Sequence, residues 1–132
     1  MADYLSMRLD DAEIHNISSL GLAHLGDAVY ELMVRSWLCK SGRATAKGLH
    51  KAAIGFVSAP AQAQAVNKLM PVLTDDEQTV FRRGRNTRVN SVPRNSTLDE
   101  YHASTGFETL FGYLYLKGET TRLNDLFELI IS

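Results

Sequence analysis

Two acidic side chains stand in strongly apolar segments of this sequence, and they are the first candidates for chemistry. Asp27 lies in the middle of LGLAHLGDAVYELMVRSWL, residues 20–38. Glu108 lies in the middle of LDEYHASTGFETLFGYLYL, residues 98–116. A carboxylate in apolar surroundings is costly unless it is paired, hydrogen-bonded or bound to a cation. Both acids therefore require a partner.

The spacing of apolar residues predicts that both segments are helices. In residues 20–38 such residues recur at intervals of three and four over nearly the whole circumference, which predicts a helix in the interior of the protein. Gly26 precedes Asp27, and Gly106 and Gly112 flank Glu108. Glycine is a poor helix former unless another group must approach closely. The simplest packing of the two helices places their acids face to face.

Two interpretations of these acids stay open at this point: they face each other, or they are unrelated. If they face each other and bind Mg²⁺, which prefers oxygen ligands, keeps several waters and needs only one or two protein carboxylates, the pair makes a metal site. Without a cation, like charges at close range raise one pKa and keep that acid protonated. Alternatively, Asp27 and Glu108 are unrelated, and each bonds a nearby backbone group, because structural networks also bury acids.

Length and composition predict one globular domain. The 132 residues are 45% hydrophobic and 22% charged, and we expect residues 1–132 to form a single domain with residues 1–16 loosely held. One cysteine, Cys39, excludes an intramolecular disulfide and is typical of a reducing compartment. The acidic N-terminus does not resemble a signal peptide, and no apolar run has the length of a membrane span. We therefore expect a soluble cytoplasmic protein without membrane contact.

Helix signals along the rest of the chain predict an all-α fold. Thr74 with Glu77, and Thr97 with Glu100, form capping boxes that begin helices near residues 75 and 98. Further helices are predicted at about residues 19–41, 45–57, 60–70 and 121–131. Residues 84–96, which contain asparagines, serines and a proline, are predicted to be irregular. No segment shows the alternation of a strand.

An arginine-rich stretch precedes the Glu108 helix. Between residues 81 and 97 there are five arginines and no acid, although the whole chain has a net charge of −1. The planar guanidinium group suits phosphate oxygens, and loops on rigid scaffolds commonly hold binding groups. A solvated surface is the alternative, and asparagines are equally good turn residues. The candidate phosphate-binding residues are Arg82, Arg83, Arg85, Asn86, Arg88 and Arg94.

Other polar residues carry weaker signals. His24, His50 and His102 are scattered, so no zinc site is expected. Glu31 lies one turn after Asp27, where it either joins the site or forms an ion pair with Arg35.

Several motifs resemble a known family. LGDAVYEL, residues 25–32, resembles the signature helix of the ribonuclease III family, E-x-x-E-F-L-G-D-A-V-L-E. STGFETLFGYLYL, residues 104–116, resembles its second catalytic helix, D-x-x-E-A-x-x-G-A-x-Y-L. The whole chain is most similar to Mini-ribonuclease III, the short bacterial branch that consists of the catalytic domain alone. The matching segments are GLAHLGDAVYE (21–31), LHKAAIGFVSAPAQA (49–63), RRGRN (82–86), PRNST (93–97) and YHASTGFETLFGYLYL (101–116).

The resemblance implies a ribonuclease III-like helical fold and an endoribonuclease that cuts double-stranded RNA as a homodimer. Asp27 matches the signature aspartate that serves metal and catalysis, and Glu108 matches the metal ligand of the second helix. Mg²⁺ is the implied cofactor, with Mn²⁺ able to substitute for it. The implied substrate is the precursor of large-subunit (23S) ribosomal RNA, cut during ribosome biogenesis with the help of a large-subunit ribosomal protein. The arginines and Asn86 would follow the duplex backbone.

Three positions depart from the larger family. Ala23 and Thr105 stand where that family has acids, and His24 stands where it has the phenylalanine of the dimer contact. The short branch shares the reduced set of acids. Two rival functions remain: a non-catalytic RNA-binding relative that acts in ribosome assembly, and an all-α nucleotide pyrophosphohydrolase. The second would need clustered acids of the ExxE type on one helix, and none is seen.

Overall fold

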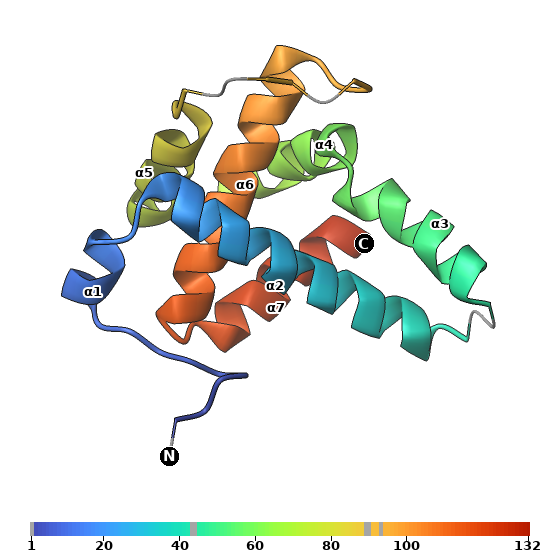
Figure 1. Ribbon diagram of the computed structural model, residues 1–132, viewed down its shortest axis with the longest axis horizontal. Coiled ribbons are helices and arrows are strands. Elements are labelled where there is room, and N and C mark those ends of the chain that lie inside the picture. Colours follow the sequence, from blue (N-terminus) through green and yellow to red (C-terminus); the bar gives the residue numbers. More distant parts are fainter. Residues whose placement is uncertain (1, 43–44, 89–90, 93) are drawn as a thin grey trace.

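The structure, a computed structural model, describes residues 2–42, 45–88, 91–92 and 94–132. All regular elements in these residues are helical, which confirms the all-α prediction (Figure 1). They are α1 (Asp11–His15), α2 (Ser19–Lys40), α3 (Ala46–Val57), α4 (Ala59–Leu69), the 3₁₀ turn η1 (Met70–Val72), α5 (Asp75–Arg85), α6 (Leu98–Leu116) and α7 (Thr120–Ile131). None of the helices in these residues has both the length and the hydropathy that a membrane crossing requires.

Helix α6 is the element on which the others pack. Ten of its nineteen residues are buried, and α2, α4, α5 and α7 all contact it. In Figure 1 it runs through the middle of the molecule, with α5 on one side, α4 on the other and α2 crossing in front. The capping box of Thr97 and Glu100 begins α6 as predicted, because each side chain accepts a hydrogen bond from the other's backbone amide.

Helix α2 is less buried than its sequence predicts. Tyr30 and Val34 are fully buried, but Leu20 is 48% and Leu32 is 56% exposed, and Asp27 is exposed too. The expectation of an interior helix is therefore wrong for one face of α2. A helix with apolar residues all round can be buried on every side, or it can leave one apolar face exposed in the single chain. The sequence pattern is the same in both cases. As a consequence, Asp27 is accessible from outside.

The N-terminal segment, which the sequence predicts to be loosely held, contains the short helix α1. Asp10 and Glu13 form a capping box that begins α1, with an aspartate in the position where threonine served above. Ile14 is buried in a small cluster with Leu22 and Leu116. The Leu9 amide donates to the Leu116 carbonyl at 2.9 Å. These contacts attach α1 to the start of α2 and the end of α6.

Two glycines allow the backbones of α2 and α6 to touch. A Cβ atom on Gly26 would stand 1.7 Å from the Glu108 carbonyl oxygen, and one on Gly112 would stand 2.0 Å from the Leu22 carbonyl oxygen. Both distances are far below van der Waals contact. No other residue type fits at this crossing unless the helices separate.

A partly buried ion pair connects α5 to α7. The Arg122 guanidinium donates to both carboxylate oxygens of Glu77 at 2.8 Å, and to the Val72 carbonyl at 2.8 Å. Burial alone would raise the pKa of Glu77, but the hydrogen bonds from Arg122 and from the Thr74 amide outweigh it and lower the pKa. The pair is therefore charged and satisfied, and it sets the direction in which α5 leads to the arginines at its end.

The glycine crossing predicts a large cost for a single added methyl group. Gly26→Ala should lower the free energy of unfolding by about 3 kcal/mol or more, the upper end of overpacking costs, because the clash is with backbone and not with a flexible side chain. Urea denaturation followed by circular dichroism measures this.

Gly55→Ala is the matched control, because a Cβ at that exposed helical position meets nothing within 4 Å. It should stabilise the protein by about 0.5–1 kcal/mol, the ordinary gain of alanine over glycine in a helix. Equal effects of the two substitutions would contradict the close crossing.

Candidate active site

The structure brings Asp27 and Glu108 together where α2 crosses α6. Their carboxyl groups lie close enough to share a hydrogen bond. The crossing itself produces this proximity, because Gly26, which precedes Asp27, lies against the backbone carbonyl of Glu108. Two acids that are 81 positions apart in the sequence thus meet at one point, as their glycine neighbours predict.

The acid pair is electrostatically unfavourable in the protein alone. Burial, then the negative charge of Asp27 and the hydrogen bond with it, raise the pKa of Glu108 to about 8, and Glu31 adds to the effect. A hydrogen bond from Gln62 acts in the opposite direction. In the described residues, no lysine or arginine forms an ion pair with either acid. The site therefore has an excess of negative charge on oxygen atoms.

Such a site fits Mg²⁺. The ion prefers oxygen ligands, keeps several of its waters and commonly uses only one or two carboxylates. Within the part of the chain that is described, no group of three or more His, Cys, Asp or Glu residues is arranged to hold a metal. Asp27 and Glu108 would therefore be the protein's carboxylate ligands, and waters and substrate oxygens would complete the coordination.

Gln62 and Ser104 belong to the site, although the sequence analysis did not identify them. Gln62 lies on α4 and is fully buried. Its Nε2 donates to Glu108 Oε2 at 3.4 Å, and its Oε1 accepts from the Ser104 hydroxyl at 2.5 Å. A signal was present in the sequence, because Gln62 precedes the apolar residues Ala65, Val66 and Leu69 at helical spacing. A polar residue on such a face requires a buried partner.

Glu31 forms an ion pair with Arg35 at 2.7 Å. Of the two interpretations left open for Glu31, the structure therefore contains the ion pair. Its charge still contributes to the raised pKa of Glu108, so it lies near the site.

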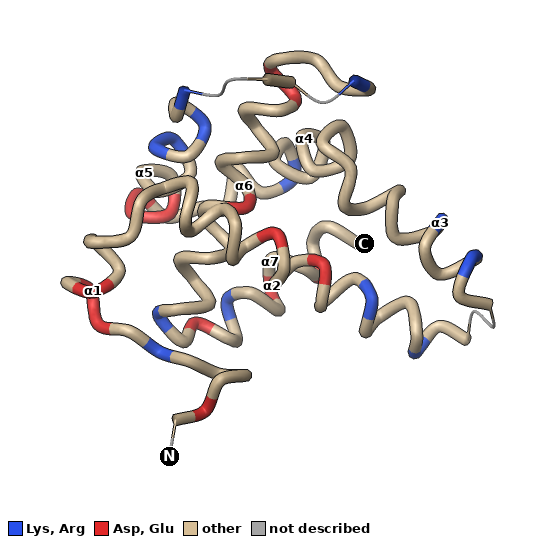
Figure 2. The backbone as a smooth tube through the Cα atoms, viewed as in Figure 1, with Lys and Arg blue, Asp and Glu red and all other residues tan. Residues whose placement is uncertain are grey.

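The arginines predicted to bind phosphate begin on a helix and not on a loop. Arg82, Arg83 and Arg85 lie in the last turn of α5, and Asn86 is its C-cap. Figure 2 shows basic segments gathered at this end of α5. Arg88 and Arg94 are exposed beyond the helix, whereas residues 89–90 and 93 of the predicted irregular stretch lie outside the described residues.

The end of α5 is fixed to α6. The His102 Nδ1 atom lies 2.8 Å from the Arg85 carbonyl oxygen, and a Cβ on Gly84 would stand 2.2 Å from the Thr109 hydroxyl oxygen. Thr109 follows Glu108 directly, so the same segment of α6 that carries the acid also seats the basic end of α5. This contact links the two halves of the predicted site.

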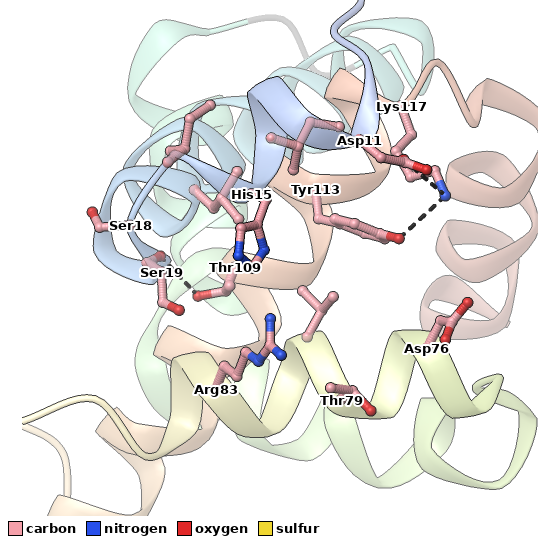
Figure 3. A pocket seen from close by; sticks show the side chains of 14 residues that line it. Asp11, His15, Ser18, Ser19, Asp76, Thr79, Arg83, Thr109, Tyr113 and Lys117 are labelled. Carbon is pink, nitrogen blue, oxygen red and sulfur yellow. Dashed lines mark hydrogen bonds and ion pairs between the residues drawn. The ribbon is translucent and has the colours of Figure 1, made fainter.

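The arginine side chains do not all point the same way. The Arg82 guanidinium bonds to Gln78 Oε1 at 3.2 Å. Arg83 points instead into a cavity of about 530 Å³ between α1 and α5, toward His15 (Figure 3). Neither Asp27 nor Glu108 lines this cavity. Arg82 and Arg83 therefore point in different directions.

Comparisons with known proteins identify the family. Residues 20–119 match the family model described as the ribonuclease III domain. The chain belongs to the ribonuclease III family. The Mini-ribonuclease 3 of Symbiobacterium thermophilum is 48% identical over 109 residues, which cover 83% of this chain and 84% of that protein. The Mini-ribonuclease 3 of Clostridium tetani is 37% identical over 130 residues, which cover 98% and 86%.

A solved structure supports the fold as well. A crystal structure of a protein from Fusobacterium nucleatum superimposes with a TM-score of 0.83 at 28% sequence identity, and covers 90% of this chain and 95% of that one. The sequence resemblance to the Mini-ribonuclease III branch is thus confirmed, and so is the ribonuclease III fold.

Two positions where the larger family has acids by resemblance are buried in this member. Ala23 and Thr105 are both buried, and the Thr105 hydroxyl donates to the Tyr101 carbonyl at 3.0 Å. His24, in contrast, is exposed on the free face of α2.

The raised pKa of Glu108 predicts that the metal-free protein loses stability as the pH rises. The ordinary pKa of a glutamate is 4.5, so the folded state binds this proton more tightly than the unfolded state does. Its stabilising contribution is complete below pH 4.5, decreases as the pH approaches 8 and is lost above that. Urea unfolding in EDTA between pH 5 and 9 measures the slope.

Glu108→Gln supplies the control, because the amide does not titrate. Subtracting its curve from the wild-type curve isolates Glu108, and the difference should favour the wild type more at pH 5 than at pH 9. Added Mg²⁺ should restore wild-type stability at high pH, because the cation replaces the proton. A difference curve that is flat with pH would refute the coupling of the two acids.

Proposed function

We propose that the protein is a Mg²⁺-dependent endoribonuclease that cuts both strands of double-stranded RNA. The carrying observation is the Asp27–Glu108 oxygen pair at an accessible helix crossing, in a chain whose curated relatives are named Mini-ribonuclease 3. The acids stand on the two helices whose motifs define the family. No closed pocket is required for this substrate, because a long duplex is bound across a surface.

The proposed mechanism divides the work between the acids and the basic end of α5. Asp27 and Glu108 would hold the cation, which when bound would supply the activation of water and the stabilisation of charge on the scissile phosphate. Asp27 is exposed, so a polymer backbone reaches it without any opening of the fold. Arginines and Asn86 at the end of α5 hold neighbouring phosphates, as expected for A-form RNA, which is recognised mainly through its backbone. Mn²⁺ would substitute for Mg²⁺, since it too suits carboxylate and water ligands.

We further propose that the active form is a homodimer. Cutting both strands of a duplex needs two acid pairs, and one chain supplies one. The exposed Leu20 and Leu32, on the face of α2 that also carries His24, are the proposed subunit contact. Apolar side chains on an unpaired helix face are typical of such interfaces.

The proposed biological substrate is the precursor of 23S ribosomal RNA, cut with a large-subunit ribosomal protein as partner. This assignment follows the family resemblance, and it places the protein in the cytoplasm, where bacterial ribosomes mature. We infer that residues 1–132 act as one catalytic domain.

Neutralising either acid should abolish cutting without loss of RNA binding. Asp27→Asn and Glu108→Gln should each reduce the rate of cleavage of a long RNA duplex by about 10²-fold or more, because each removes a ligand of the cation that stabilises the transition state. Duplex affinity, measured by fluorescence anisotropy, should stay within about threefold, because phosphate contacts supply most of it. Circular dichroism reports folding.

Glu128→Gln on α7 is the matched control and should cut at the wild-type rate. Nucleoside triphosphates with Mg²⁺ test the pyrophosphohydrolase alternative and should remain intact. Duplex binding by the wild type without any cutting would support a non-catalytic RNA-binding role and reject the nuclease.

The basic end of α5 should control affinity and its dependence on salt. For the double variant Arg82→Ala/Arg85→Ala, the slope of log affinity against log salt should fall by about 0.7–0.9 for each lost phosphate contact. Anisotropy titrations at several salt concentrations give both quantities.

The double variant Lys47→Ala/Lys51→Ala on α3 is the comparison, because it also removes two positive charges, at exposed positions of a different helix. It should change the slope less than the arginine substitutions do. Equal changes would indicate a diffuse electrostatic effect and would remove the end of α5 from the binding surface.

A further inference from the structure

A fully buried amide lies directly behind the acid pair. Gln62 is 0% exposed on α4, between α4 and α6. A buried amide is costly unless its donor and acceptor groups are both bonded. Both ends of this amide have a partner, and the two partners are Ser104 and Glu108, which are one turn apart on the same face of α6.

Only one orientation of the Gln62 amide satisfies both partners when Glu108 is ionised. A carboxylate only accepts hydrogen bonds, so the Gln62 NH₂ group must face Glu108 Oε2, which lies 3.4 Å from Nε2. The Gln62 carbonyl oxygen then faces Ser104, whose hydroxyl donates to it at 2.5 Å. The opposite orientation would place two acceptor oxygens against each other. Ionised Glu108 therefore selects this orientation, and the Ser104 hydroxyl, which can donate or accept, stabilises it by donating to the Gln62 carbonyl oxygen.

We propose that Gln62 and Ser104 are positioning residues that occupy one carboxylate oxygen of Glu108 and leave the other to bind the divalent cation. The inference rests on the proposed function and adds two residues to its site. Hydrogen bonds of this kind orient metal ligands in proteins, and their loss typically weakens metal affinity by about 10–100-fold. Gln62 is buried and cannot contact RNA. Gln62 and Ser104 would therefore affect metal binding only through Glu108.

A purely structural role is the competing explanation. The hydrogen bond between α4 and α6 would then contribute only to stability, and metal affinity would be unaffected in any folded variant. Stability and metal affinity therefore have to be measured separately. The double variant Ser104→Ala/Gln62→Met allows this, because it removes both polar partners and leaves no unsatisfied group of the pair, which is often nearly neutral for stability.

The test measures Mn²⁺ binding by electron paramagnetic resonance, which counts free ions and requires no RNA. Gln62→Met keeps the length of the side chain but removes its donor, and it should bind Mn²⁺ about 10–100-fold more weakly. The double variant should show the same loss, and Ser104→Ala an intermediate loss, because Gln62 is then present but free to turn. Gln64→Met, an exposed position of the same helix, should bind like the wild type.

Cleavage kinetics give a second readout. The Mg²⁺ concentration for half-maximal cleavage should rise in Gln62→Met and in the double variant, and saturating Mg²⁺ should recover much of the rate. Urea unfolding in EDTA monitors stability in parallel.

Mn²⁺ affinities within about twofold of the wild type in Gln62→Met, Ser104→Ala and the double variant would overturn the inference. Failure of the proposed function looks different. In that case the wild type itself would bind no Mn²⁺, or would bind it with an affinity that Glu108→Gln leaves unchanged.

Discussion

The contact of two helix backbones at Gly26 and Gly112 is the constraint on which the site depends. Because neither residue has a Cβ, α2 and α6 approach until backbone atoms touch, and the crossing point is fixed by hard contact. Asp27 and Glu108 lie immediately beside this point. Their separation is therefore set by the rigid helices and not by flexible loops, which suits a site where displacements of about 1 Å are costly. The site is also at the surface of the single chain, because Asp27 is exposed.

Helix α6 serves a different function on each of its sides, which explains why it is buried almost all round. Gly112 admits α2, Gly106 and Thr109 receive α5, and Ser104 and Glu108 face Gln62 on α4. Contacts with α6 thus set the positions of the acid pair, the amide behind it and the arginines at the end of α5. The partly buried Glu77–Arg122 ion pair holds the start of α5 against α7 in the same way. A shift of α6 would displace every part of the site together.

The sequence was informative wherever the signal was local. Capping boxes at Thr74 and Thr97 located helix starts, and glycines beside isolated acids indicated a close crossing of α2 and α6. It failed where residues that pair in space carry no such local mark. The bond between Gln62 and Ser104 joins residues 42 positions apart on different helices, and no spacing rule connects them. The direction of Arg83 depends on the position of α1, and the exposed face of α2 depends on what lies outside one chain.

The repulsion within the acid pair requires a rigid crossing of α2 and α6. Asp27 and Glu108 repel each other when both are charged, and burial makes the charge of Glu108 more costly still. A looser crossing would relieve the repulsion by separating the helices, but the cation would then lose its paired ligands. The glycine contact opposes that separation with backbone packing over two long helices. The arrangement therefore has to be neutralised, by a proton on Glu108 or, in the proposed site, by a divalent cation, so metal affinity and folding stability would be linked through the same two carboxyl groups.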